Sequence, residues 1–108
     1  MTVSVITVTF NAAATVDMAV RSVLEQSGDF RLDYHIVDGG STDGTLDVLK
    51  AHQAGIAQIT SGPDNGLYDA MNRGVARAKG DIIGILNADD AYADPQVIAD
   101  VLRTFEET

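Results

Sequence analysis

Apolar residues along this chain alternate between short continuous runs and stripes at helical spacing. The runs are rich in β-branched residues and are bounded by turn-forming residues, which is typical of strands. The predicted strands are 3–10, 34–37, 56–60 and 81–86. After each strand, apolar residues recur every three or four positions, which predicts a helix. Helical spacing begins after a Thr15 cap, at Leu46, at Leu67, and after Asp94-Pro95, where Asp caps the helix and Pro takes its first position.

Each predicted helix carries one apolar face. The faces consist of Val16, Ala19, Val20, Val23 and Leu24 before Gly28, of Leu46, Val48 and Leu49 before Gly55, of Leu67, Met71, Gly74, Val75 and Ala78 before Lys79-Gly80, and of Val97, Val101, Leu102 and Phe105. The strands are almost continuously apolar, so both faces of the sheet are expected to be covered. The sequence therefore predicts an α/β fold, a parallel sheet within a three-layer sandwich.

A polar cluster follows each predicted strand. The clusters are Thr9 to Asn11, Asp38 to Asp43, Ser61 to Asn65, and Asn87 to Asp90. The carboxyl ends of parallel strands lie along one edge of a sheet, and open α/β sheets bind ligands outside that edge. We therefore expect the four clusters to meet in one site.

The acidic run Asn87-Ala88-Asp89-Asp90 directly follows the apolar strand 81–86. Adjacent carboxylates there are costly unless a cation lies against them, and Asp oxygens are hard ligands suited to Mg²⁺ or Mn²⁺. With a formal net charge of −9, the chain would repel an anionic substrate in the absence of such a cation. The run predicts metal-assisted binding of a phosphate-bearing ligand, and the alternative is a solvated acidic loop.

The segment 38–45 combines a carboxylate at a strand end with glycines that permit a ligand to approach the backbone. The Asp38 carboxylate can accept a hydrogen bond from a ribose hydroxyl or from a base N–H. The alternative is an Asx turn that leads into a helix capped by Ser41, Thr42 or Asp43.

Composition narrows the classes of function. A chain of 108 residues forms one domain with one core. Seven Lys and Arg against sixteen Asp and Glu argue against a nucleic-acid partner. The absence of Cys excludes a thiolate nucleophile and a Cys-based zinc site, and it fits a reducing cytoplasm. We predict no transmembrane segment, since the run 3–10 is too short to span a bilayer.

The motifs occur in an order that resembles one known family. Residues 3–11 resemble an opening strand that ends in an aromatic–Asn pair, and residues 37–45 resemble a V-D-[DG]-[GN]-S-x-D-x-T block. Three further segments resemble an N-x-G…N-x-G…A-x-G pattern: Asn65-Gly66, Asn72-Arg73-Gly74 and Ala78-Lys79-Gly80. Residues 86–90 fall where a D-x-D metal motif belongs. Together they resemble the nucleotide-sugar-binding half of glycosyltransferase family 2, the inverting enzymes with the GT-A fold.

The resemblance implies roles for the site residues. Phe10 and Asp38 would face the nucleotide base and ribose. Asp89 would bind a divalent cation, Mn²⁺ or Mg²⁺, that bridges the diphosphate, with Asp90 as a further candidate ligand. Asn87 stands where many members have Asp. The implied nucleotide-sugar-binding residues are Thr9, Phe10, Asp38, Asn65, Asn87 and Ala88.

The implied activity is metal-dependent transfer of a sugar from a nucleotide-diphosphate sugar, by default a UDP-sugar, to an acceptor hydroxyl. The acceptor would be a saccharide or a lipid-linked acceptor in polysaccharide biosynthesis, and the enzyme would be cytoplasmic or peripheral to the membrane. Family members usually extend well beyond this length, and no carboxylate here matches their catalytic base. We therefore expect residues 1–108 to be a truncated, donor-binding half without the acceptor half, inactive alone, with an exposed sheet edge that permits a homodimer.

Two alternatives stay open. The first is a non-catalytic binding or assembly module with the same fold, which the missing base favours and the intact Asp38 and Asp89 disfavour. The second is a sugar nucleotidyltransferase. Such an enzyme is expected to have a Gly-rich, basic phosphate loop after the first strand, and Asn11-Ala12-Ala13-Ala14 does not resemble one.

Overall fold

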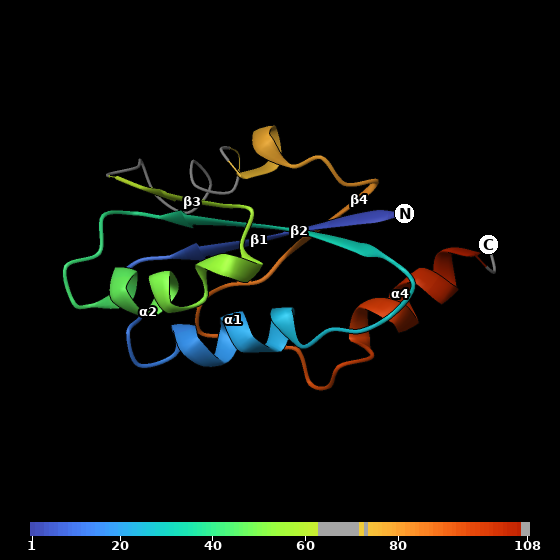
Figure 1. Ribbon diagram of the computed structural model, residues 1–108, viewed down its shortest axis with the longest axis horizontal. Helices are drawn as coiled ribbons and strands as arrows, with labels where there is room; N and C mark the ends of the chain where they lie inside the picture. The colour runs from blue at the N-terminus through green and yellow to red at the C-terminus, as the bar shows by residue number, and fades with distance from the viewer. Residues whose placement is uncertain (63–71, 73, 107–108) are drawn as a thin grey trace.

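The structure, a computed structural model, describes residues 1–62, 72 and 74–106. Within these residues the chain forms a parallel sheet with strand order β3-β2-β1-β4 (Figure 1). The strands are β1 (Thr2–Thr9), β2 (Arg31–Asp38), β3 (Gln58–Ser61) and β4 (Ile82–Ile85). The helices are α1 (Val16–Leu24), α2 (Thr45–Ala51), the short 3₁₀ helix η1 (Gln53–Gly55) and α4 (Val97–Glu106), and residues 74–77 are also helical.

The register aligns the carboxyl ends of the strands. Thr9 of β1 pairs with Asp38 of β2, and Asp38 pairs in turn with Ser61 of β3. On the other side of β1, Ile6 pairs with Ile85 at the end of β4. All of these pairings are parallel, so the segments that follow the strands leave the sheet at the same edge, which we call the carboxyl edge.

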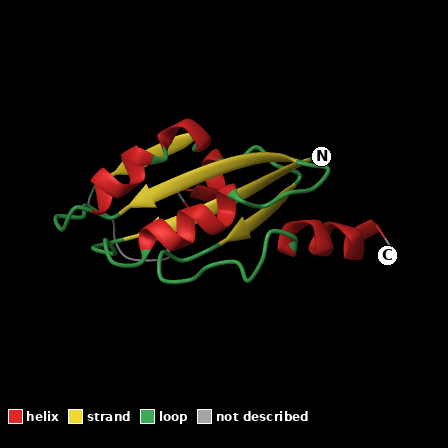
Figure 2. Cartoon of the chain, turned by 60° about the horizontal axis from the view of Figure 1, so that its bottom comes forward, coloured by secondary structure: helices red, strands yellow, loops and turns green. Residues whose placement is uncertain are grey.

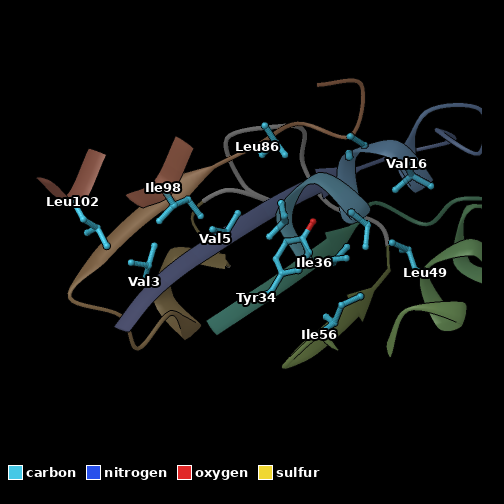
Figure 3. Packing of buried hydrophobic residues seen from close by; sticks show 14 residues of the cluster. Val3, Val5, Val16, Tyr34, Ile36, Leu49, Ile56, Leu86, Ile98 and Leu102 are labelled. Atoms are coloured by element: carbon cyan, nitrogen blue, oxygen red, sulfur yellow. The ribbon is translucent and has the colours of Figure 1, made fainter. Parts of the chain in front are cut away.

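Two apolar clusters lie on opposite faces of the sheet. Helices α1, α2 and α4 cover one face (Figures 1 and 2). Figure 3 shows the cluster beneath them, in which Val5 and Ile36 of the sheet face α1. On the other face, Ile6, Val8 and Val37 are buried and Ala78 packs against them. These two layers around a parallel sheet confirm the predicted three-layer α/β fold.

The second strand is longer than predicted. It begins at Arg31 instead of Tyr34, because the polar side chain of Asp33 is satisfied within the fold. Asp33 accepts hydrogen bonds from the hydroxyl of Ser4 at 2.7 Å and from the backbone N–H of Lys79 at 3.0 Å. A search for apolar runs therefore misses the polar first half of this strand, because its polar side chains have hydrogen-bond partners in distant segments. The predicted bounds of the third strand were also wrong, since β3 occupies residues 58–61 instead of 56–60.

Two predicted helix faces need correction. In α4 the buried residues are Ile98 and Leu102, whereas Val101 is 45% exposed. Val75 is likewise 42% exposed. Both Val101 and Val75 fit the helical spacing of apolar residues. In the structure, however, a different face of each helix packs on the sheet. Of the remaining predicted positions, Leu67, Met71 and the side chain of Phe105 lie outside the described residues.

The helices begin and end only partly at the capping and helix-breaking residues that the sequence predicted. Helix α1 begins after Thr15, but the Thr15 side chain makes no capping hydrogen bond there, and the helix ends at Leu24, well before Gly28. Helix α4 begins at Val97 and not at Pro95 as predicted, so Asp94 is not its N-cap; the Asp94 Oδ1 instead accepts the backbone N–H of Gln96 at 2.7 Å in the turn before the helix. Helix α2 ends at Ala51, and η1 continues the turn to Gly55.

Strand β4 is the last strand on its side of the described sheet. Its side chains Ile83 and Ile85 are 41% and 45% exposed, which agrees with the expected apolar edge, while dimerisation through that edge stays a prediction. In the part of the chain that the structure describes, no helix has the length and apolar character needed to cross a bilayer.

Candidate functional site

The structure brings most of the predicted site residues to the carboxyl edge. Thr9 and Asp38 are direct partners at the ends of β1 and β2. The backbone N–H of Ala88 donates to the carbonyl of Val8 at 3.2 Å, which holds the acidic loop against the end of β1. Asn65, the remaining nucleotide-binding candidate of the third cluster, lies outside the described residues.

Asp38 is entirely buried and its carboxylate is surrounded by donors. Oδ2 accepts the backbone N–H of Gly40 at 3.0 Å and of Ser41 at 2.9 Å, and the hydroxyl of Ser61 at 2.8 Å. Oδ1 accepts the Ser41 hydroxyl at 2.5 Å. Gly40 has φ 93°, a conformation that glycine adopts without strain. The geometry is that of the Asx turn considered as an alternative, and the contact of Asp38 with base or ribose stays a prediction.

Sequence reasoning missed Ser61 as a partner of Asp38. It lies 23 residues along the chain and meets Asp38 only because β3 pairs with β2 in this register. The available signal was a hydroxyl residue at the end of the third predicted strand, opposite a carboxylate at the end of the second.

The loops after β1 and β2 are joined by hydrogen bonds, and we call residues 11–13 and 41–45 the paired loops. Asn11 contributes twice: its backbone N–H donates to the Ser41 hydroxyl at 2.8 Å, and its Oδ1 accepts the Thr42 N–H at 2.8 Å. The backbone N–H of Ala12 donates to the Thr45 hydroxyl at 2.9 Å. Sequence reasoning placed Asn11 in the polar cluster at the end of the first strand but did not foresee these bonds.

Asp43 completes the connection between the paired loops. Its Oδ2 accepts the Ala13 N–H at 3.1 Å, while its Oδ1 accepts the hydroxyl and the backbone N–H of Thr45 at 2.5 and 3.1 Å. These donors, the Thr45 hydroxyl above all, hold the pKa of Asp43 below its ordinary value. Asp43 therefore binds the first residue of α2 from just outside the helix, while the N-cap position is Gly44 and not Ser41, Thr42 or Asp43 as the alternative interpretation predicted.

Phe10 and Thr9 differ sharply in exposure at the end of β1. The Phe10 side chain is 62% exposed, which is unusual for a large aromatic residue and leaves a ring face available at the carboxyl edge. Thr9 is buried, and its Oγ1 has no hydrogen-bond partner among the described residues. A buried hydroxyl without a hydrogen-bond partner is uncommon, so the Thr9 Oγ1 is a hydrogen-bonding group that the described residues leave available.

The acidic loop separates buried from exposed residues. Leu86 and Ala88 are buried in the core, whereas Asp89 and Asp90 are exposed. The Asp90 N–H donates to the Asn87 carbonyl at 3.0 Å, which closes a turn around the two carboxylates. The side-chain Oδ1 of Asn87 is buried and has no partner in the described part of the chain.

These oxygens fit a partial shell for a divalent cation. No group of three or more His, Cys, Asp or Glu side chains converges among the described residues, so they offer no complete protein cage. Mg²⁺ and related cations at nucleotide sites need only one or two carboxylates, with phosphate oxygens and water completing the shell. The exposed Asp89 and the unpartnered Asn87 Oδ1 supply hard oxygen donors of that kind.

Two mycobacterial proteins are similar to this chain in sequence. An uncharacterized glycosyltransferase of Mycobacterium tuberculosis, Rv1514c, is 40% identical over 102 residues, which cover 94% of this chain and 39% of that protein. The PGL/p-HBAD biosynthesis glycosyltransferase Rv2957 of the same species is also 40% identical over 102 residues, covering 91% of this chain. The chain thus spans about two fifths of the length of these relatives.

Solved glycosyltransferase structures share the fold. Staphylococcus aureus TarS in complex with UDP-GlcNAc superposes with a TM-score of 0.87 at 22% identity, over 99% of this chain and 32% of TarS. The mannosyltransferase PcManGT of Pyrobaculum calidifontis, solved with GDP-Man and Mn²⁺, superposes with a TM-score of 0.82 at 26% identity, over 94% of this chain and 31% of that enzyme. These superpositions confirm the predicted GT-A type of α/β fold.

The family model for glycosyl transferase family 2 matches residues 4–108, which is nearly the whole chain. It includes every helix and strand of the described fold, apart from the first two residues of β1, and all four polar clusters in the order expected. This protein chain belongs to glycosyl transferase family 2.

Proposed function

We propose that this chain forms the donor-binding half of an enzyme that transfers a sugar, with a divalent cation, from a nucleotide-diphosphate sugar to an acceptor hydroxyl. The observation that carries the proposal is the carboxyl edge, where the exposed Phe10 ring, the exposed Asp89 carboxylate and the unpartnered Asn87 Oδ1 follow adjacent strands. Membership of the family and the donor complexes of TarS and PcManGT support it.

The two sides of the edge would bind different parts of the donor. Phe10 offers an aromatic face on which a nucleotide base can stack. Asp38 keeps Gly40 and Ser41 in a fixed turn beside it, and the predicted contacts to base and ribose would be made there. Across β1, Asp89 would face the diphosphate. Thr9 lies between the two sides at the end of β1, and its hydroxyl has no hydrogen-bond partner among the described residues.

Asp89 would hold the cation, with Asn87 Oδ1 beside it and Asp90 as a further ligand. When bound, the cation would neutralise charge on the diphosphate leaving group. The acceptor oxygen would form a bond to the anomeric carbon as the bond from that carbon to the diphosphate breaks. The acceptor proton would pass to a base, which we do not assign to a residue of this chain. A UDP-sugar is the proposed donor, Mn²⁺ or Mg²⁺ the cation, and a saccharide or lipid-linked hydroxyl the acceptor.

Calorimetric titration of UDP into the chain tests the proposal. Binding is expected with Mn²⁺ and is expected to disappear with EDTA and in Asp89→Ala. Asp29→Ala is the matched control, because Asp29 is an exposed carboxylate that precedes β2 at the opposite edge of the sheet. Equal binding by wild type and Asp89→Ala, or binding that ignores EDTA, would contradict the proposed metal site.

A further inference from the structure

The two exposed carboxylates lie in a very short span between two hydrogen-bonded points. On one side, the Ala88 N–H donates to the carbonyl of Val8 at 3.2 Å. On the other side, the Tyr92 N–H donates to the hydroxyl of Ser22 in α1 at 3.0 Å. Only Asp89, Asp90 and Ala91 lie between these points. The position of the carboxylates therefore depends on α1 as well as on the sheet.

Ser22 is itself held in one orientation. Its hydroxyl donates to the carbonyl of Ala19 at 2.7 Å, which leaves the oxygen lone pairs to accept from Tyr92. Ala19 and the neighbouring Val23 are fully buried, so this part of α1 is packed firmly on the sheet. The Ser22 hydroxyl thus connects the chain after the acidic loop to a fixed point of the core.

Gln26, one turn further along the chain, binds the same segment with both ends of its amide. Its Nε2 donates to the carbonyl of Asp94 at 2.7 Å and to that of Ser22 at 3.1 Å. Its Oε1 accepts the backbone N–H of Ile98 at 2.9 Å, an otherwise free donor in the first turn of α4. One side chain thereby joins α1, the loop and the next helix.

Backbone contact reinforces this joint. The Ser27 N–H donates to the carbonyl of Pro95 at 2.9 Å, and Figure 1 shows the chain after β4 running along α1 before it enters α4. The segment 92–98 therefore returns to the carboxyl-terminal end of α1 and is fastened there. We call Ser22 and Gln26 the clasp.

We propose that the clasp is a pair of positioning residues that hold the Asp89 carboxylate in place for a divalent cation bound with a nucleoside diphosphate. The inference rests on the function proposed above and adds residues that touch neither ligand. With the clasp intact, the three-residue span has few conformations. Without it, the nearest hydrogen bonds to the core on either side of the carboxylates are those of Ala88 with Val8 and of Pro95 and Gln96 with Ser27, so the free span is longer and the carboxylate loses its fixed position. Loss of partners that orient metal ligands typically lowers metal affinity by about 10–100-fold.

The test compares Ser22→Ala and Gln26→Met with Asp17→Ala. Ala and Met remove the hydrogen bonds of the clasp while keeping much of the packing. Asp17 provides the control, since it lies in α1 as Ser22 does but bonds to His52 at 2.8 Å, after α2, and not to the segment 92–98. Hydrogen exchange of the ligand-free chain and Mn²⁺ uptake in the presence of UDP, followed by electron paramagnetic resonance, are the two readouts.

In both clasp variants we expect faster exchange at the amides of Tyr92 and Ile98, with unchanged exchange in the paired loops. We expect the Mn²⁺ half-saturation concentration to rise about tenfold or more, and to stay unchanged in Asp17→Ala. Unchanged exchange at these amides overturns the clasp whatever the ligand. Faster exchange with unchanged Mn²⁺ uptake overturns its positioning role. Failure of the wild-type chain to take up Mn²⁺ with UDP overturns the proposed function itself, and the exchange data still report whether the clasp orders the loop.

Discussion

The side-chain Oδ1 of Asn11 accepts the backbone N–H of Thr42 at 2.8 Å, joining the loops that follow β1 and β2. Asn11 has φ 47°, in the left-handed region that Asn tolerates better than most residues. The same residue thus bends the chain away from β1 and binds the neighbouring loop. This relationship orders two of the four segments at the carboxyl edge.

Substitution of Asn11 is expected to separate these two contributions. Asn11→Ala loses the hydrogen bond and strains a left-handed residue, so we expect a loss of about 2 kcal/mol in the free energy of unfolding. Asn11→Gly loses only the bond and is expected to lose about 1 kcal/mol. Urea denaturation of the two variants measures both values. A glycine variant less stable than the alanine variant would contradict this account of the turn.

Acid should weaken the link that Asp43 makes. Its pKa is depressed in the folded chain, chiefly by the Thr45 hydroxyl, so its contribution to stability is present above the unfolded pKa of about 4 and is lost as pH falls through the folded value. Asp43→Asn is therefore expected to be less stable than wild type near neutral pH, with the difference shrinking below about pH 4. Denaturation midpoints of both proteins across this range provide the measurement. A difference independent of pH would show that the charge of Asp43 is irrelevant.

Tyr34 and Thr7 form a buried pair beneath α1. Their hydroxyl oxygens lie 2.7 Å apart, and both residues are fully buried. Tyr34→Phe leaves the Thr7 hydroxyl without this partner and is expected to destabilise the chain by about 1–3 kcal/mol. Adding Thr7→Val to that variant should cost less than Thr7→Val does in wild type, because the partner is already gone. A double-mutant cycle measured by urea denaturation checks this, and strictly additive effects would contradict the pairing.

Alkaline pH should unfold the chain partly through Tyr34. Burial raises the pKa of Tyr34 to about 12, so the folded state keeps the phenol protonated while the unfolded chain ionises near pH 10. Stability from this group is full below about pH 10 and is lost as pH rises towards 12. Wild type is expected to lose more stability across this interval than Tyr34→Phe. Parallel losses in the two proteins, followed by tyrosinate absorbance and circular dichroism, would contradict the shift.

The layout of the fold was accessible from sequence because its strands and helices carry strong periodic signals. Residues 3–8 are all apolar or β-branched except Ser4, and they form most of β1 as predicted. The amino-terminal half of β2 was missed, since Asp33 is stabilised by Ser4 and by the backbone of Lys79, which are distant in sequence. The buried face of α4 was also wrong at Val101, because spacing defines a stripe but not which of two neighbouring stripes meets the sheet.

The candidate site divides in the same way. Residue types at strand ends were enough to predict that Thr9, Asp38 and Ala88 gather at one edge, because parallel topology alone brings them there. The partners that orient them were not predictable from spacing. Ser61 reaches Asp38 from another strand, and Gln26 reaches Asp94 across 68 positions. Such long-range partners become visible only once the register of the sheet and the path of the chain after β4 are known.

Paramagnetic broadening of backbone amide signals by Mn²⁺ in the presence of UDP tests the central claim most directly. The account predicts that broadening centres on Ala88 and Asp89 and extends to Gly39 and Gly40 across the carboxyl edge, while Arg31 at the opposite edge keeps a sharp signal. Replacing Mn²⁺ with Mg²⁺ should restore the lost signals without displacing UDP. Broadening centred on Arg31, or spread evenly over the exposed carboxylates, would contradict a cation site at Asp89.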